Sequence, residues 1–275
     1  MAWFFGNSLV TGMERSTSKA TTWSQFWLAV FTAYFFASAL LLFLSSLALL
    51  PYCYLFDRNR RLLSSLACLW GYHFVRLNPG WRCHFDGLSN FRRGETYIIV
   101  ANHQSIADVF ILSGLGQSFK WVSKESLFKL PFFGWNMYLK KDIAIQRGDM
   151  SSIKAMLATC TEWLKKGETI LMFPEGTRSE TGEIIAFRDG SFRLAVQNNI
   201  AILPVVLNGT REILPKQDPQ LKMSARVDVK ILAPIYPEQC GNSAPELKRY
   251  VQNLMKETLA EMRLPVGETS NSVNV

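Results

Sequence analysis

A histidine and an aspartate stand five positions apart in a segment whose residue types suit acid–base chemistry. Residues 102–108 read Asn-His-Gln-Ser-Ile-Ala-Asp and follow residues 97–101, a β-branched run that predicts a buried strand. His103 would then lie at the carboxyl end of a strand, where open α/β sheets bind their ligands. If a helix begins near Ser105, Asp108 lies in its first turn and can fold back onto the imidazole. A carboxylate on one imidazole nitrogen fixes the tautomer and makes the other nitrogen a better base.

The same aspartate also fits a purely structural role. Residues 105–108, Ser-Ile-Ala-Asp, have the pattern of a capping box, in which the acid holds the start of a helix. Because such boxes are common, these residues alone leave both interpretations open.

A second charged segment comes at the end of another predicted strand, at residues 169–173. Residues 173–179 read Phe-Pro-Glu-Gly-Thr-Arg-Ser, which brings an acid and an arginine to the same sheet edge as His103. Arg178 has the planar donor geometry for a bidentate contact to phosphate, and Glu175 has the charge to orient it. The alternative is a solvated turn with an incidental ion pair.

The elements that must position these segments alternate along the chain. Short apolar runs predict strands, and stretches with a helical apolar stripe predict helices between them. Alternation of this kind predicts an α/β fold, a largely parallel sheet flanked by helices. The expected strands are residues 97–101, 143–145, 169–173, 202–207 and 225–232, and the expected helices are residues 106–113, 151–166, 191–198 and 244–262.

The chain begins with a strongly apolar region. Residues 20–56 contain no ionisable acid or base, and residues 27–50 are almost wholly apolar. As a helix, the latter stretch would reach about 36 Å, enough to cross a hydrocarbon core of roughly 30 Å. Ala-Ser-Ala at residues 37–39 resembles a signal-peptide cleavage site, but the apolar run continues well beyond it. We therefore expect an N-terminal apolar helical membrane anchor.

A second apolar run, residues 62–75, would reach only about 21 Å as a helix, so we expect it to lie at the interface or against the first helix. Basic residues on both sides of the first run decide its orientation only weakly. The excess after it favours a cytoplasmic location for the C-terminal side. A hairpin dipping into one leaflet is the alternative to a spanning helix. The charges weighed are Glu14, Arg15 and Lys19 before the run and Asp57, Arg58, Arg60 and Arg61 after it.

Composition sets the remaining limits. The 275 residues carry a net charge of +8 and are 48% hydrophobic, which excludes a disordered or collagen-like chain. Five widely spaced cysteines form neither a disulfide framework nor a zinc signature. We expect membrane-anchoring helices in residues 1–78, an α/β domain in residues 79–263 and a frayed tail in residues 264–275.

Together the two charged segments resemble the glycerophospholipid acyltransferase family, closest to its 1-acylglycerol-3-phosphate (lysophosphatidate) acyltransferase branch. Residues 134–147 stand where that family has its second motif, although Ile-Ala-Ile replaces a frequent phenylalanine. Residues 202–206 resemble its fourth, proline-centred motif, and Lys124 matches a basic position between the first and second motifs. The resemblance covers about residues 80–215, and an N-terminal apolar anchor is also typical of the family.

The resemblance implies acyl transfer from a fatty acyl thioester to the sn-2 hydroxyl of lysophosphatidate, giving phosphatidate in phospholipid biosynthesis. It implies His103 and Asp108 as the catalytic pair. It implies no metal and no cofactor beyond the acyl donor, which is either acyl-CoA or acyl carrier protein. Its partners are then membrane lipid, the two substrates and, as one alternative, acyl carrier protein, with no nucleic acid. The substrate-binding residues that it implies are Lys124, Arg147, Glu175, Gly176, Thr177 and Arg178.

Two points stay open. Residues 127–135 are apolar with one lysine, which suits a bilayer-facing surface, the wall of an acyl channel or ordinary core packing. The alternative functions are a membrane acyltransferase or transacylase with a different acceptor and a catalytically silent membrane scaffold. We expect the protein in a membrane with its catalytic domain on the cytoplasmic face.

Overall fold

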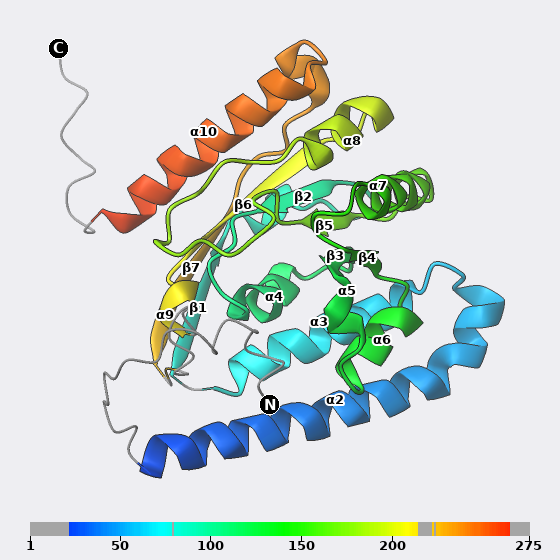
Figure 1. The fold of residues 1–275 in the computed structure, drawn as a ribbon, viewed down its shortest axis with the longest axis vertical. Helices are drawn as coiled ribbons and strands as arrows, with labels where there is room; N and C mark the ends of the chain where they lie inside the picture. The colour runs from blue at the N-terminus through cyan, green and yellow to red at the C-terminus, as the bar shows by residue number, and fades with distance from the viewer. Residues whose placement is uncertain (1–21, 79, 214–221, 223, 265–275) are drawn as a thin grey trace.

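A seven-stranded sheet forms the centre of the molecule (Figure 1). The computed structural model describes residues 22–78, 80–213, 222 and 224–264. In space the strands follow the order β1-β7-β6-β2-β5-β3-β4, and all neighbours are parallel except β6 and β7. The strands are β1 (Trp81–Asp86), β2 (Ile98–Ala101), β3 (Lys120–Lys124), β4 (Ile143–Ile145), β5 (Ile170–Met172), β6 (Ile202–Asn208) and β7 (Ala225–Ile231). The largely parallel sheet predicted from the alternation of elements is confirmed.

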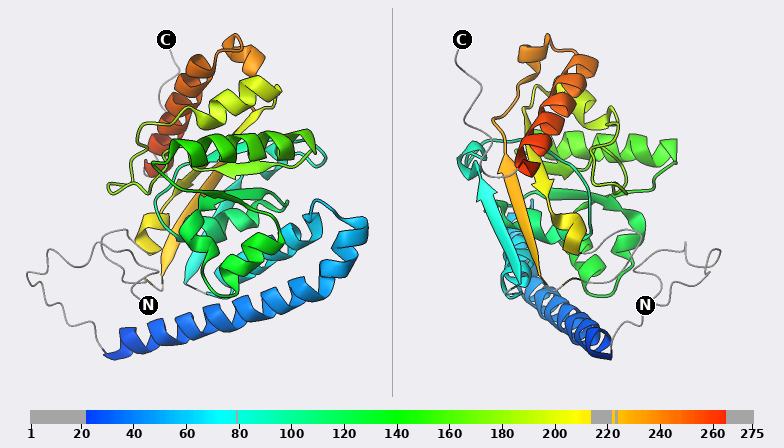
Figure 2. Two further views of the ribbon diagram at one scale, coloured as in Figure 1. Left: turned by 45° about the vertical axis from the view of Figure 1, so that its right-hand side comes forward. Right: turned by 90° about the vertical axis from the view of Figure 1, so that its left-hand side faces the viewer.

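Helices cover both faces of this sheet (Figures 1 and 2). On one face lie α7 (Met150–Lys165), α8 (Gly190–Asn198) and α10 (Ala244–Arg263). On the other lie α3 (Arg61–Arg76) and α4 (Ala107–Leu112), with the long α2 (Thr22–Phe56) beyond them. The remaining short helices are α5 (Glu125–Phe128), α6 (Phe133–Leu139) and α9 (Thr210–Ile213).

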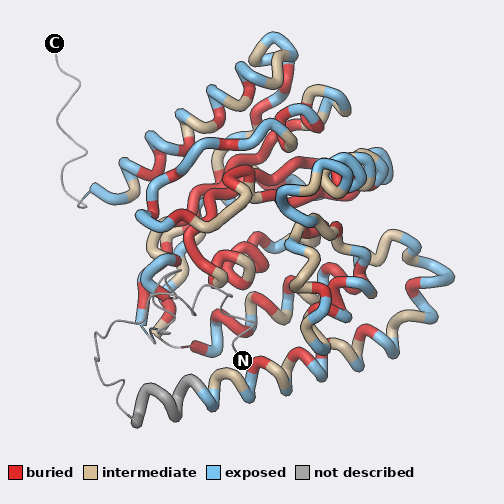
Figure 3. Tube along the Cα trace, viewed as in Figure 1, coloured by how far each residue is buried: buried red, intermediate tan, exposed pale blue. Residues whose placement is uncertain are grey.

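Alternation along the buried strands divides the core into two layers. In β2, Ile98 and Val100 pack with residues of α7, α8 and α10, whereas Ile99 and Ala101 pack with residues of α3 and α4. All four are fully buried, as expected for a central parallel strand covered on both faces. Figure 3 shows this buried centre and the more exposed outer surfaces of the helices.

Two strands have no counterpart among those predicted from the sequence. β1 is an edge strand that pairs only with β7, and its burial alternates because Trp81, Cys83 and Phe85 pack on the core while the residues between them face away. β3 begins at Lys120, and a charged residue does not fit the apolar sequence pattern that predicts a buried strand. Its ammonium is nevertheless fully buried and donates to the backbone oxygens of Asn59 and Lys140 and to Ser64 Oγ. Tertiary hydrogen bonds of this kind leave no periodic signal.

The two N-terminal helices form a pair that lies along one side of the molecule. α2 is one continuous helix through Pro51, and it contains a stretch, Ala29–Phe56, long and apolar enough to cross a membrane. α3 packs between α2 and the sheet, with Phe35 of α2 near Trp70 and Phe74 of α3. The second apolar run is therefore packed against the first, one of the two expected arrangements. The charges at residues 14, 15 and 19 and residues 265–275 of the expected tail lie outside the described residues.

Candidate active site

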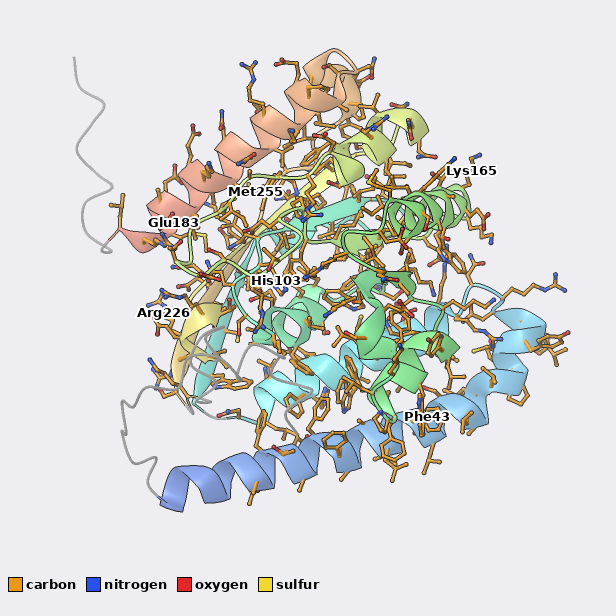
Figure 4. All side chains as sticks on the ribbon, in the orientation of Figure 1. Phe43, His103, Lys165, Glu183, Arg226 and Met255 are labelled. Carbon is orange, nitrogen blue, oxygen red and sulfur yellow. The ribbon has the colours of Figure 1, made fainter. Side chains whose placement is uncertain are left out.

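The imidazole of His103 is held by the carboxylate of Asp108. His103 follows β2 in a turn, and Asp108 lies in the first turn of α4, so the chain folds back as the sequence predicts. The distance from His103 Nδ1 to Asp108 Oδ2 is 2.8 Å, and Asp108 is fully buried. The imidazole also stacks on Phe173, with ring centroids 4.0 Å apart. These two contacts fix the ring and leave Nε2 as the nitrogen away from the carboxylate. Figure 4 shows His103 beside α4, near the middle of the molecule.

Asp108 is at the same time a helix-start residue. Its Oδ2 accepts hydrogen bonds from the backbone N–H groups of Gln104 and Ser105, at 2.7 and 2.9 Å. The capping interpretation and the catalytic interpretation therefore apply to one carboxylate rather than excluding each other. Ordering of the turn by these amides also sets the position of the imidazole.

The two charged segments lie side by side at the carboxyl edge of the sheet. The N–H of His103 donates to Glu175 Oε1 at 2.8 Å, and the N–H of Ser179 donates to the backbone oxygen of His103 at 2.7 Å. A third contact runs from Gln104 Nε2 to the backbone oxygen of Gly182 at 3.0 Å. Because β2 and β5 are neighbouring parallel strands, the segments that follow them meet at one edge.

Both oxygens of Glu175 are used within the protein. Oε1 accepts from the His103 N–H, Oε2 accepts from the Ile185 N–H at 3.3 Å, and the residue is only 3% exposed. Burial raises the pKa of this carboxyl to about 7, although the two backbone hydrogen bonds act in the opposite direction. The geometry therefore makes Glu175 a residue that positions the His103 turn and leaves it little surface for substrate.

The predicted cations lie at the same edge. Arg147 follows β4, Arg178 follows β5, and Lys124 is the exposed last residue of β3, paired in register with Ile145 of β4. Partial burial lowers the pKa of Arg178, and the nearby charge of Asp108 opposes this shift. Burial also lowers the pKa of Arg147, and the charge of Arg178 contributes to that shift. Arg147 and Arg178 therefore share one electrostatic environment.

Gly176 and Thr177 complete the predicted binding segment. Gly176 has φ +70°, a left-handed conformation that glycine adopts without strain, and its N–H donates to the backbone oxygen of Phe173 at 3.1 Å. Thr177 is half-buried in the same turn. The turn redirects the chain immediately after β5 and brings Arg178 to the sheet edge.

An apolar cavity of about 130 Å³ lies beside His103. It opens between α2, α3, α4 and α6, and its walls are chiefly apolar and aromatic. Residues that line it include Phe35, Ala67, Trp70, His103, Ile106, Phe110, Leu127, Phe133, Met137 and Asp142. The cavity therefore places the imidazole of His103 beside a space suited to a hydrocarbon chain.

The apolar run at residues 127–135 serves several of the predicted roles at once. Leu127 and Phe133 line the cavity, Phe128 is buried in the core, and Trp135 is 43% exposed beside Phe43 of α2. Its sequence could not separate these roles because α5 and α6 are short, and their tertiary neighbours α2 and α3 lie far away in the chain.

Comparison with known proteins places this arrangement in a family. The Acyltransferase family model matches residues 82–208, which contain both charged segments. A 1-acyl-sn-glycerol-3-phosphate acyltransferase of Pseudomonas aeruginosa is 33% identical over 197 residues, which cover 71% of this chain and 76% of that protein. The chain belongs to this acyltransferase family.

Other relatives extend the likeness to plants and to a solved structure. A chloroplastic 1-acyl-sn-glycerol-3-phosphate acyltransferase of Arabidopsis thaliana is 35% identical over 76% of this chain, which spans only 58% of that relative's length. The crystal structure of the 1-acyl-sn-glycerophosphate acyltransferase PlsC of Thermotoga maritima has a TM-score of 0.72 and 26% identity. The match covers 88% of this chain and 98% of the Thermotoga maritima chain. The acyltransferase family therefore shares both sequence and fold with this chain.

Some features of the site were not predicted from the sequence. The sequence places Phe173 at the end of a strand and the start of the charged segment, but it does not predict that the Phe173 ring supports the imidazole of His103. The cavity walls on α3 and α4 are not predicted either, because the apolar stripe of a helix does not show which element it faces. In the part of the chain that the structure describes, no group of three or more metal-ligating side chains gathers.

Proposed function

We propose that this acyltransferase moves a fatty acyl chain from a thioester to the sn-2 hydroxyl of lysophosphatidate, giving phosphatidate. The observation that carries the proposal is the 2.8 Å contact between His103 Nδ1 and Asp108 Oδ2 at the edge of an apolar cavity. A general base, a hydrocarbon-sized apolar space and basic residues then lie together at one sheet edge. The acceptor is the one in the names of the relatives described above, and the thioester donor is part of the proposal.

In this reaction His103 Nε2 takes the proton of the acceptor hydroxyl, while Asp108 stabilises the resulting imidazolium through Nδ1–H. The acceptor oxygen attacks the thioester carbonyl, the carbon–sulfur bond breaks, and the proton leaves with the thiol. A thioester is already activated, so the reaction needs neither a covalent enzyme nucleophile nor a cofactor. The described cysteines fit this view, because none lies in either charged segment.

The acyl chain and the phosphate are assigned to different parts of the site. The apolar cavity accepts the hydrocarbon chain of the donor, and Arg178 and Arg147 hold the phosphate of the acceptor by charge-assisted hydrogen bonds. Lys124, at the end of β3, adds positive charge at this edge. Acyl-CoA and acyl carrier protein both present the thioester that this arrangement requires.

The test is an acylation assay of the detergent-purified protein with labelled donors and a panel of lysolipids. We expect transfer to lysophosphatidate that requires a thioester donor. We expect His103→Ala to lower turnover by roughly 10²–10⁴-fold, the usual contribution of a general base, without loss of folding or membrane association. Transfer from a phospholipid without any thioester would instead identify a transacylase. Near-normal turnover of His103→Ala would withdraw the assignment of the base.

We further propose that α2 dips into one leaflet, with the catalytic domain on the cytoplasmic face. Buried Asn136 of α6 donates to Ser46 Oγ in the middle of α2 at 2.7 Å, so a spanning α2 would draw α6 into the hydrocarbon. In such a membrane hairpin, formed by the two apolar segments α2 and α3, both ends lie on one side of the bilayer. A protease-sensitive tag before residue 1 and the catalytic domain would then be cleaved from the same side of sealed vesicles. Cleavage from opposite sides would establish a spanning helix.

A further inference from the structure

Arg188 lies outside every motif described above, yet its side chain reaches the turn that carries Arg178. The N–H of Arg188 donates to the backbone oxygen of Pro174 at 2.9 Å, which folds the segment before α8 back onto the turn after β5. Its guanidinium then lies directly over Gly176. A Cβ atom built on Gly176 would be 2.5 Å from Arg188 Nε and 2.9 Å from Cζ. The missing side chain of Gly176 is thus the space that the guanidinium occupies.

Arginines from three different segments lie in this part of the sheet edge. Arg147 comes from the end of β4, Arg178 from the turn after β5 and Arg188 from the start of α8. The charges of Arg188 and Arg178 both act on Arg147 and help to lower its pKa, Arg188 more than Arg178. Cations that approach one another repel, and an anion bound among them relieves that repulsion.

No acid of the described chain neutralises Arg188. Among the described residues, neither Arg188 nor Arg147 has a carboxylate oxygen within 4.0 Å of its side chain. The neighbouring Asp189 is paired with Lys248 of α10 at 2.6 Å. Arg188 is exposed, so a ligand can reach it.

We infer that Arg188 is a third phosphate-binding arginine, which joins Arg147 and Arg178 around the phosphate monoester of the acceptor lipid. This inference rests on the acyl transfer proposed above and adds a residue that determines acceptor specificity. A phosphate monoester carries close to two negative charges and three acceptor oxygens, which matches a group of guanidinium forks better than a phosphodiester does.

The position of the group favours the acceptor over the donor as the source of the phosphate. The segment that carries Arg178 is hydrogen-bonded to the His103 turn, where the acceptor hydroxyl must lie. In lysophosphatidate the phosphorus is four bonds from the sn-2 hydroxyl oxygen. In a pantetheine thioester the nearest phosphorus is more than ten bonds from the sulfur, which places it farther from His103.

The test compares steady-state kinetics of the unaltered protein and three variants in detergent micelles. We expect Arg188→Gln to raise the KM for lysophosphatidate by about 10- to 100-fold, because loss of a hydrogen bond to a charged group weakens binding by about that factor. We expect kcat and the KM for the acyl donor to change by less than about twofold. Arg188→Lys should recover part of the loss, since it restores the charge without the planar fork. The matched control is Arg193→Gln, which removes an exposed arginine of α8 that is not among the charges acting on Arg147.

Two outcomes would overturn the inference. Arg188→Gln could behave as Arg193→Gln does, or it could raise the KM for the acyl donor alone, which would assign Arg188 to the donor's phosphates. Phosphorus NMR can measure the binding of lysophosphatidate when no acyl donor is present. This readout does not depend on catalysis. If the unaltered protein transfers no acyl chain, the proposed function fails. Weaker phosphate binding by Arg188→Gln than by Arg193→Gln would still support the contact, and equal binding would refute it.

Discussion

At the scale of single residues, one carboxylate joins folding to chemistry. Asp108 accepts two backbone N–H groups and one imidazole nitrogen through the same oxygen, so the turn that it orders is also the turn that presents His103. Phe173 stacks on one face of the His103 imidazole. The imidazole is therefore preorganised before any substrate binds, which lowers the cost of reaching the transition state.

Replacement of Asp108 by asparagine tests this double role. An amide oxygen can replace the one oxygen that accepts all three contacts, but it carries no charge to stabilise the imidazolium. The amide NH2 would also be buried without a partner where Asp108 Oδ1 lies. We expect Asp108→Asn to lower kcat by roughly 10²–10⁴-fold and the free energy of unfolding by about 1–2 kcal/mol. Kinetics and thermal unfolding in the same detergent measure the two effects. Unchanged kcat beside a lower melting temperature would leave Asp108 with the structural role alone.

Glu175 predicts a pH dependence of stability. Burial raises its pKa from 4.5 to about 7, so the folded protein favours the protonated form. The stability that this group contributes is complete below about pH 4.5 and is lost as the pH rises through about 7. The loss amounts to about 3 kcal/mol at ~1.4 kcal/mol per pKa unit.

Glu175→Gln stays neutral and provides the comparison. The melting temperature of the unaltered protein minus that of Glu175→Gln should fall by several degrees between pH 5 and pH 8. A difference that does not change with pH would contradict the raised pKa. We also expect a difference in melting temperature that does not depend on pH. The amide nitrogen of the glutamine is a donor, and it must face one of the backbone N–H groups that Glu175 accepts from.

At the scale of elements, much of the fold could be predicted because local patterns coincide with the sheet. The expected strands at 97–101, 143–145, 169–173, 202–207 and 225–232 all appear, with boundaries shifted by a residue or two. β1 and β3 are not among the expected strands. Residues 81–86, Trp-Arg-Cys-His-Phe-Asp, alternate apolar and polar types and so do carry a strand signal, which the prediction did not use. β3 depends on tertiary hydrogen bonds of Lys120, which leave no pattern in the sequence.

Part of the candidate site could likewise be predicted from the sequence, and part could not. His103, Asp108 and Arg178 follow strands at one sheet edge, so sequence order and topology together predict that they meet. Arg188 could not be predicted, because it follows an irregular stretch with no periodicity and meets Gly176 only through folding of that stretch. The cavity also depends on how α3 packs on α4, which no single element specifies.

Close packing between α3 and the end of α4 gives a prediction at this scale. Gly71 of α3 lies against Ser113, so a Cβ at position 71 would be 2.5 Å from Ser113 Oγ and 2.8 Å from Ser113 Cβ. Overpacking costs about 1–3 kcal/mol, and the helix preference of alanine over glycine returns up to about 1 kcal/mol. We expect Gly71→Ala to lower the free energy of unfolding by roughly 1–2 kcal/mol. The control on the same helix, exposed Ser65→Ala, should change it by less than about 0.5 kcal/mol.

At the scale of the whole molecule, α2 presents two different surfaces. One carries buried residues toward α3 and α6, and the other carries exposed leucines, including Leu41 and Leu44 at 67% and 52% exposure. Figure 2 shows α2 running beneath the rest of the molecule, with α10 on the far side. An exposed apolar surface of this kind is typical of contact with lipid, which would place the cavity beside the membrane. In the proposed reaction the acyl chains would then reach the cavity from that membrane.

Charges on this outer surface should therefore release the protein from the bilayer. Each leucine transferred from water into lipid contributes about 1.5–3 kcal/mol, so loss of two corresponds to at least about a hundredfold weaker partitioning. We expect the double variant Leu41→Asp with Leu44→Asp to show this drop in vesicle sedimentation, while the fold of the catalytic domain is retained. The matched control is Leu264→Asp, an exposed leucine just after α10 with no part in the α2 surface. If both variants sediment like the unaltered protein, the outer surface of α2 does not contact lipid. The route of the acyl chains into the cavity would then have to be sought elsewhere.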